Sequence, residues 1–133
     1  MDLGLRGAKV VVTAGAAGIG RAIVDGFLAE GATVATCDVD KAGLATLPPG
    51  VIARQVDVSD AAALTDFMDR AISELGGLDC LVNNAGIAGP TARVEDIDHS
   101  DWDLCLRVCL TSQFVATGRA VGALRQSPNA SIV

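Results

Sequence analysis

The stretch from Val10 to Arg21, VVVTAGAAGIGR, decides the fold of this chain. Its apolar first residues predict a buried strand, and apolar residues at helical spacing follow its three glycines. A strand, a glycine-rich turn and a helix in this order bring backbone N–H groups and a helix N-terminus up to a phosphate. Glycine suits the turn because a Cβ would hold a phosphate away from the backbone. The stretch therefore predicts an anion site at Gly15, Gly18 and Gly20, with a tight connection that binds no ligand as the alternative.

Short apolar runs alternate with amphipathic patterns along the rest of the chain. Strands are expected over residues 8–13, 33–38, 52–56 and 78–82, with a fifth beginning at 131; helices are expected over 18–30, 41–47, 59–75 and 98–124, the third with Ser59 and the fourth with Asp98 as N-cap. Such alternation predicts right-handed crossovers and a parallel sheet covered on both faces. The expected fold is a three-layer, doubly wound α/β domain over residues 1–133, truncated at the start of its fifth strand.

The composition indicates one globular domain. Half of the 133 residues are apolar and one fifth are charged, with a formal net charge of −6 and a pI near 4.5. An acidic chain without a basic stripe argues against a nucleic-acid partner. No apolar run approaches the roughly 20 residues of a membrane helix, and the first residues lack the layout of a signal peptide. We therefore expect a cytoplasmic protein that has neither nucleic acid nor membrane as a partner.

The four cysteines form no CxxC pair. Cys37 and Cys80 fall in expected buried strands and are interpreted as inert core thiols. Cys105 and Cys109 lie four residues apart on an expected helix, so two thiols on one face could touch a metal, but no third ligand is near. We expect no metal site, and this cysteine usage fits a reducing cytoplasm.

Other conspicuous side chains have structural interpretations. His99, the only histidine, lies at a helix start and is expected to be a solvated residue rather than a catalytic base. The acidic residues between 96 and 103 are favourable near a helix N-terminus for electrostatic reasons, which we prefer to a metal site. Trp102 and Phe114 lie on the apolar stripe of the last helix and are assigned to the core or to an interface.

Two further features follow strands that should lie near the first one. Asp38 ends the second strand about 20 residues after the turn, where a carboxylate can accept hydrogen bonds from ribose hydroxyls and would repel a 2′-phosphate. An ordinary solvated carboxylate is the competing interpretation, because Asp40 lies two residues on. Residues 83–86, NNAG, follow the fourth strand. Their amides can tie the strand end to its neighbours, while Ala85 and Gly86 leave room for a flat ligand; a plain turn is the alternative.

Together these motifs resemble those of the short-chain dehydrogenase/reductase family. Residues 13–20 are similar to its T-G-x-x-x-G-[IL]-G fingerprint, Asp57 and Val58 resemble its D-V pair, residues 83–86 resemble its N-N-A-G motif, and the stretch from Trp102 resembles its central helix. The resemblance covers essentially the whole chain, and the motifs are specific in this order and spacing. It implies a Rossmann-like fold, a nicotinamide dinucleotide cofactor, and the interconversion of alcohols and ketones by hydride transfer.

The resemblance also implies a role for each matching residue. Gly15, Gly18, Ile19 and Gly20 would hold the pyrophosphate, Asp38 the adenosine ribose, Asp57 and Val58 the adenine, and Asn83, Ala85 and Gly86 the inner ribose region; Thr13 and Asn84 complete the expected cofactor set, and Asn83 also has an expected structural role. The acidic residue at position 38, with no Arg or Lys at 14, 16, 17 or 39, implies NAD as the cofactor. The last helix resembles the one that packs family dimers and tetramers, so a homo-oligomer is expected.

Three departures from the family pattern bear on activity. The family's first glycine is Ala14 here, and positive φ at an alanine costs on the order of 1 kcal/mol, so we expect a reshaped turn in which Gly15 takes the strain. Cys109 stands where the family usually has a catalytic Asn. The chain has no tyrosine, and its only lysines are Lys9 and Lys41, so the family's Tyr-x-x-x-Lys has no counterpart. No catalytic residue is therefore identified.

Two hypotheses about function follow from the sequence. The first is the cofactor-binding half of an NAD-dependent oxidoreductase that interconverts a secondary alcohol and a ketone, in which these 133 residues alone are inactive. The second is a dinucleotide-binding or interaction module without catalysis. The substrate cannot be identified from these residues.

Overall fold

The first strand, β1 (Lys9–Thr13), lies in the middle of a five-stranded parallel sheet in the computed structural model, which describes residues 1–133. The strand order is β3-β2-β1-β4-β5, and the other strands are β2 (Thr33–Asp38), β3 (Ile52–Gln55), β4 (Cys80–Val82) and β5 (Ser131–Ile132). The order reverses between β1 and β4, and ligands of open α/β sheets bind at such a switch point. The expected doubly wound α/β fold is confirmed.

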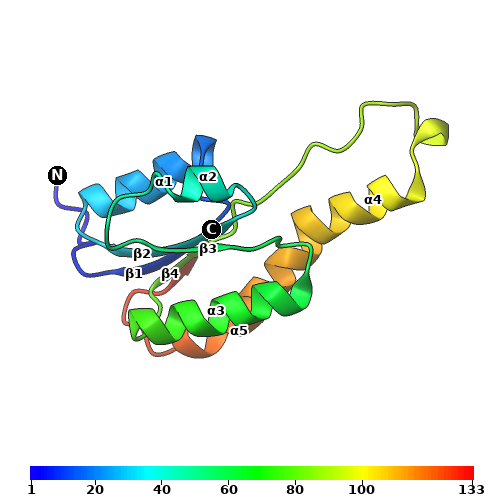
Figure 1. Cartoon of the computed structure of the whole chain (residues 1–133). Coiled ribbons are helices and arrows are strands. Elements are labelled where there is room, and N and C mark those ends of the chain that lie inside the picture. The colour runs from blue at the N-terminus through cyan, green and yellow to red at the C-terminus, as the bar shows by residue number, and fades with distance from the viewer.

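Helices cover both faces of this sheet (Figure 1). The helix α1 (Gly18–Ala29) and the short α2 (Lys41–Leu44) lie on one face, and α3 (Ala61–Leu75) and α5 (Ser112–Leu124) lie together on the other. A 3-10 turn, η1 (Val94–Asp96), precedes α4 (His99–Leu106), which projects beyond the sheet (Figure 1). No helix is both long enough and apolar enough to cross a bilayer.

The alternating side chains of β1 supply two cores. Val11 faces the cluster that α3 and α5 complete, with Leu64 and Met68 fully buried in it. Val10 and Val12 point to the opposite face, onto the cluster that contains Val24 of α1. A strand buried on both faces needs a continuous apolar run, which explains why this segment shows no polar alternation. The expected burial of Cys37 and Cys80 is confirmed.

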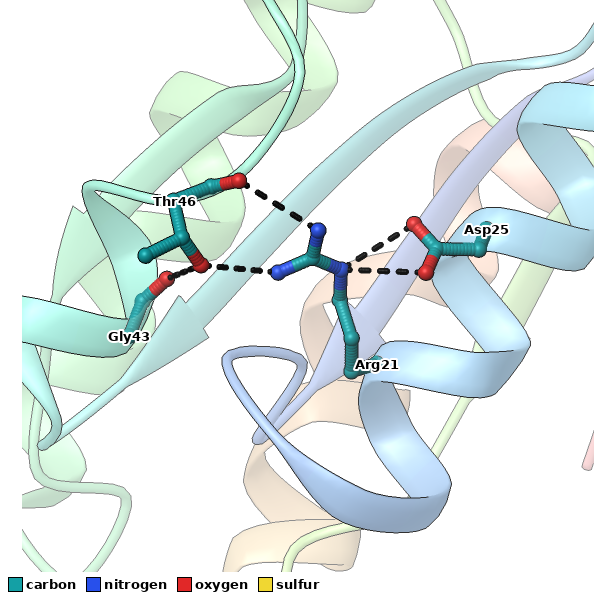
Figure 2. Close-up of polar contacts among 4 residues, drawn as sticks. All are labelled: Arg21, Asp25, Gly43 and Thr46. Atoms are coloured by element: carbon teal, nitrogen blue, oxygen red, sulfur yellow. Dashed lines mark hydrogen bonds and ion pairs between the residues drawn. The ribbon is translucent and has the colours of Figure 1, made fainter.

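One guanidinium group links α1 to the residues at the end of α2 (Figure 2). Arg21 Nε donates to both carboxylate oxygens of Asp25, at 3.0 and 3.1 Å, and its Nη atoms donate to the hydroxyl and the carbonyl of Thr46. The Thr46 hydroxyl donates in turn to the Gly43 carbonyl at 2.7 Å. This network fixes the first turns of α1 against the segment that follows Asp38.

Three details of the helices differ from expectation. Ser59 does not cap α3. The N-cap is Asp60, whose Oδ1 accepts from the N–H groups of Ala62 and Ala63, and the Ser59 N–H donates to Asp57 Oδ1 in the preceding turn. Asp98 occupies the N-cap position of α4, but its side chain makes no capping bond. The expected helix over 98–124 is continuous in direction, yet it is interrupted by the π-helical segment η2 (Arg107–Thr111).

The apolar side chains assigned to the last helix are largely unburied in this chain. Trp102 is 58% and Phe114 is 78% exposed, so neither belongs to the core. Their neighbours Leu106 and Leu110 are also exposed. The core contacts of α5 come from smaller residues, chiefly Ala116 and Ala120.

Candidate functional site

The glycine-rich turn after β1 is strained at Ala14 and not at Gly15. Ala14 has a φ of 58° and is the only non-glycine residue with positive φ. The expectation that Gly15 takes the strain is therefore wrong. Gly15 is required for a different reason, since a Cβ there would overlap the Thr36 hydroxyl and lie 2.9 Å from Val24 Cγ2. Ala14 therefore adopts a left-handed backbone conformation, which costs about 1 kcal/mol for an alanine.

The N-terminus of α1 differs from those of α2 and α3 in having no side-chain cap. Asp40 and Asp60 cap the other two helices, whereas Ala17 precedes α1 in extended conformation and no acidic residue occupies its first turn. The first N–H groups of a helix have no partner within the helix, and they carry the positive end of its dipole. Gly18, with φ of +57°, has nothing within 4 Å of where its Cβ would be. An open, uncapped helix end of this kind fits an anionic group.

Asn84 ties the end of β4 to the glycine-rich turn. Its Nδ2 donates to the carbonyls of Thr13 and Ala14, both at 3.1 Å. The Thr13 hydroxyl accepts in return from the N–H groups of Asn84 and Ala85, both at 3.0 Å. Asn83, the other amide of the pair, joins β4 to the end of the chain, because its N–H donates to the Val133 carbonyl at 2.7 Å.

The carboxylate of Asp38 lies against the same turn. Its Oδ2 accepts from the N–H of Ala16 at 3.0 Å, and its Oδ1 accepts from the N–H of Asp40 at 3.0 Å. Each carboxylate oxygen can accept more than one hydrogen bond, so both retain the capacity to receive a hydroxyl donor. Asp40 is engaged differently, since its side chain caps α2 by accepting from Gly43 at 2.9 Å.

A cleft of about 300 Å³ opens at the carboxyl ends of β2, β3 and β4. Five residues expected to hold the cofactor line it: Asp38, Asp57, Val58, Ala85 and Gly86. Six of the other lining residues were not anticipated: Cys37, Val39, Val56, Ile87, Leu104 and Val108. Ile87 could have been inferred from its position directly after Gly86, whereas Leu104 and Val108 come from a distant helix and carry no local signal. An apolar cleft with carboxylates at its rim suits a flat ring joined to a polyhydroxylated group.

Cys37, in the wall of this cleft, is an inert thiol. Burial raises its pKa to about 12, and the neighbouring Asp38 charge adds to the increase, while a backbone hydrogen bond with Ala14 opposes it. The thiol therefore stays neutral in the folded protein at any ordinary pH.

This shift predicts a loss of stability in alkaline solution. Above pH 9 the unfolded chain releases the Cys37 proton while the folded chain keeps it, so the free energy of unfolding should fall by roughly 1.4 kcal/mol per pH unit up to about pH 12. Urea unfolding between pH 8 and 10.5 measures the slope, and Cys37→Ala should flatten it. An equal slope in the two proteins would contradict the assignment.

Cys109 lies on η2, directly after Val108, which lines the cleft. Its Sγ donates to the Ile87 carbonyl at 3.3 Å and accepts from the Ile87 N–H at 3.4 Å. The thiol thus binds both polar groups of one residue just beyond the NNAG segment. A thiol is a weaker donor and acceptor than the amide for which it stands in the family pattern.

The chain matches the family model described as short chain dehydrogenase over residues 8–133. It belongs to the short-chain dehydrogenase family. Among curated relatives, it is 35% identical over 132 residues to the short chain dehydrogenase/reductase dpmpG of Macrophomina phaseolina, covering 93% of this chain and 75% of that protein. It is also 37% identical to 2-(S)-hydroxypropyl-CoM dehydrogenase 3 of Xanthobacter autotrophicus, covering 97% of this chain and 53% of that one.

Solved structures of this family share the same architecture. The ligand-free aldohexose dehydrogenase of Thermoplasma acidophilum superposes with a TM-score of 0.87 at 29% identity, over 97% of this chain and 49% of that one. A short chain dehydrogenase from Burkholderia cenocepacia in complex with NADP gives 0.82 at 36% identity, over 90% and 52%. Apart from dpmpG, the chain spans about half the length of these relatives. The family consists of oxidoreductases that bind a nicotinamide dinucleotide.

Proposed function

We propose that this chain binds NAD and forms the cofactor-binding part of an oxidoreductase that interconverts a secondary alcohol and a ketone. The observation that carries the proposal is the uncapped N-terminus of α1 beside a cleft that begins at Asp38. The helix end and Gly18 to Gly20 would hold the pyrophosphate. The cleft would take the adenosine, with Asp57 and Val58 along the ring.

The choice of NAD rests on the charge at the cleft. A carboxylate at position 38 can accept from both ribose hydroxyls and repels a 2′-phosphate. Val39 is 61% exposed beside it and offers no positive charge. A related solved structure contains NADP, so the family alone does not decide between the two cofactors.

When bound, the dinucleotide supplies or accepts the hydride. The residues of this chain bind and orient it. Asn84 and Thr13 hold the NNAG segment against the glycine-rich turn, and Cys109 holds Ile87, so the walls near the inner ribose are fixed before a ligand arrives. No residue among these 133 is assigned the proton transfer.

Replacing Ala17 with aspartate tests the proposed anion site. An aspartate at this N-cap position should raise the free energy of unfolding by about 1 kcal/mol, since it supplies the missing cap. The same carboxylate occupies the proposed pyrophosphate position, so NADH affinity should fall at least about tenfold, which is about 1.4 kcal/mol. Urea unfolding and titration followed by NADH fluorescence measure the two effects.

Ala17→Asn is the matched control, because it offers a similar cap without the charge. It should stabilise the chain comparably and weaken NADH binding less than Ala17→Asp. Equal NADH affinity in the parent and Ala17→Asp proteins would place the dinucleotide elsewhere and overturn the proposal.

A binding module without catalysis is the second candidate, and a specific observation favours it. The family's catalytic asparagine position holds Cys109, whose thiol binds the Ile87 backbone. The two candidates differ in turnover. NADH formation from NAD that depends on an added secondary alcohol would exclude the binding module.

A further inference from the structure

Two thiols of the α4–η2 helix converge on one backbone group. Cys105 Sγ donates to the Ile87 carbonyl at 3.7 Å, and Cys109 Sγ donates to the same oxygen at 3.3 Å. The N–H of Ile87 donates back to Cys109 Sγ. Both thiols are half-buried, whereas Cys37 and Cys80 are buried. The pair is thus the only one in the chain that is both close together and accessible.

The segment after Ile87 passes close to the Cys105 sulfur. Ile87 itself is 41% exposed, and at Gly89 a Cβ would lie 3.2 Å from Cys105 Sγ. The glycine therefore lets the chain pass directly over the thiol without covering it by a side chain. Leu104 and Val108, which flank the two cysteines on the same helix, line the cleft described above. The dithiol therefore neighbours residues that line that cleft.

The number of protein side chains near the two thiols limits which metal or metalloid the pair can bind. No group of three or more His, Cys, Asp or Glu side chains in the chain could hold a metal ion together. A tetrahedral zinc site needs four ligands and usually takes at least three from the protein, so the pair alone does not make one. An element that binds soft ligands and needs only two sulfurs from the protein fits the pair better than zinc does, because thiolates are soft ligands.

We infer that Cys105 and Cys109 form a dithiol site for a trivalent organoarsenical. With an arsenic(III) oxide of the form R–As=O, each sulfur forms a bond to arsenic, and the As=O bond is lost. The two S–H protons leave with the oxide oxygen as one water molecule. Arsenic stays trivalent and neither sulfur is oxidised, so no further reactant is needed. Binding replaces the thiol hydrogen bonds to the Ile87 carbonyl and frees the residue that follows the NNAG segment.

The protonation of the pair is consistent with this chemistry. Desolvation raises the pKa of Cys105, and the neighbouring Cys109 raises it further through its charge and a side-chain hydrogen bond. Both S–H protons leave in the water molecule, so the overall reaction consumes neutral thiols and a raised thiol pKa does not oppose it.

Intact-protein mass spectrometry with phenylarsine oxide tests the site. The reduced chain should retain one equivalent in the presence of excess glutathione, a monothiol, and release it to 1,2-ethanedithiol. Cys105→Ser and Cys109→Ser should each reduce apparent affinity at least about tenfold, which is about 1.4 kcal/mol. Cys80→Ala, which alters a thiol in the other core, should retain binding. Retention at parental affinity in either serine variant would overturn the inference.

A second measurement uses the unmodified chain and does not depend on how the variants fold. Iodoacetamide labelling followed by peptide mapping should show Cys105 and Cys109 protected together after phenylarsine oxide is added. Protection of Cys37 or Cys80 in their place, or of one of the pair alone, would overturn the inference.

Discussion

Gly20→Ala is expected to lower the free energy of unfolding by about 3 kcal/mol and to remove dinucleotide binding with it. Gly20 is buried in the first turn of α1, where an added Cβ would overlap the Ala14 carbonyl oxygen and lie 2.5 Å from Asn84 Nδ2. Neither neighbour can yield cheaply. The carbonyl is backbone in a residue that already has positive φ, and Asn84 holds the glycine-rich turn and β4 together.

Gly26→Ala is the matched control, because it makes the same chemical change on the same helix. Nothing lies within 4 Å of a Cβ at Gly26, so the substitution should stabilise the chain by about 0.5–1 kcal/mol through helix propensity alone. Urea unfolding of the parent and the two variants measures both effects. Destabilisation of similar size in the two variants would show that the close approach at Gly20 is not the cause.

The strands and their parallel arrangement could be predicted because parallel strands buried on both faces leave a simple pattern in the sequence. Val10 to Val12 form an uninterrupted apolar run, and the structure buries all three on two opposite faces. The carboxyl ends of neighbouring parallel strands meet at one edge, so Asp38, Asp57 and the NNAG segment could be expected together although they are far apart in the sequence. The parallel topology therefore predicted which residues meet, although their separation in the sequence did not.

The details that failed depend on particular contacts, one between distant residues and one within a short turn. Gly15 was expected to hold the left-handed conformation because glycine tolerates it, but the turn needs glycine there to pass the Thr36 hydroxyl. Ala14 is left with a φ of 58°. The cap of α3 is Asp60 and not Ser59, in a turn where the Ser59 N–H donates to Asp57. N-cap propensity ranks each residue type by itself and does not say which of two neighbouring candidates becomes the cap.

The residues that line the cleft also include some that the sequence pattern could place and some that it could not. Residues that directly follow a strand could be placed by pattern, whereas Leu104 and Val108 reach the cleft from α4 and η2 across a long loop. The π-helical segment adds to the difficulty, since it changes the phase of the helix between these two residues and α5. The contact of Cys109 with Ile87 joins this helix to a loop 22 residues earlier, and no periodicity in the sequence reports it.

The double variant Asp38→Asn, Val39→Arg is expected to shift the preference for NADH over NADPH by about 100-fold. Removing the carboxylate takes away its acceptor for the ribose hydroxyls and its repulsion of a 2′-phosphate, and the arginine adds a positive charge at an exposed position in the cleft wall. Each change is worth about 1.4 kcal/mol, or tenfold, which is well within the attraction of two charges at a protein surface. Fluorescence titration with the two cofactors measures the ratio.

Asp40→Asn separates this effect from the general acidity of the loop. Asp40 lies two residues from Asp38, but its carboxylate accepts from Gly43 as the cap of α2, and asparagine can take over that cap. The cofactor ratio should therefore stay within about threefold of the parent value, about 0.65 kcal/mol. If Asp40→Asn moves the ratio about tenfold, as much as is expected of the Asp38 change in the double variant, the two carboxylates act only through their overall negative charge. A change confined to Asp38 instead means direct contact with the ribose, as the position of its oxygens against the Ala16 N–H suggests.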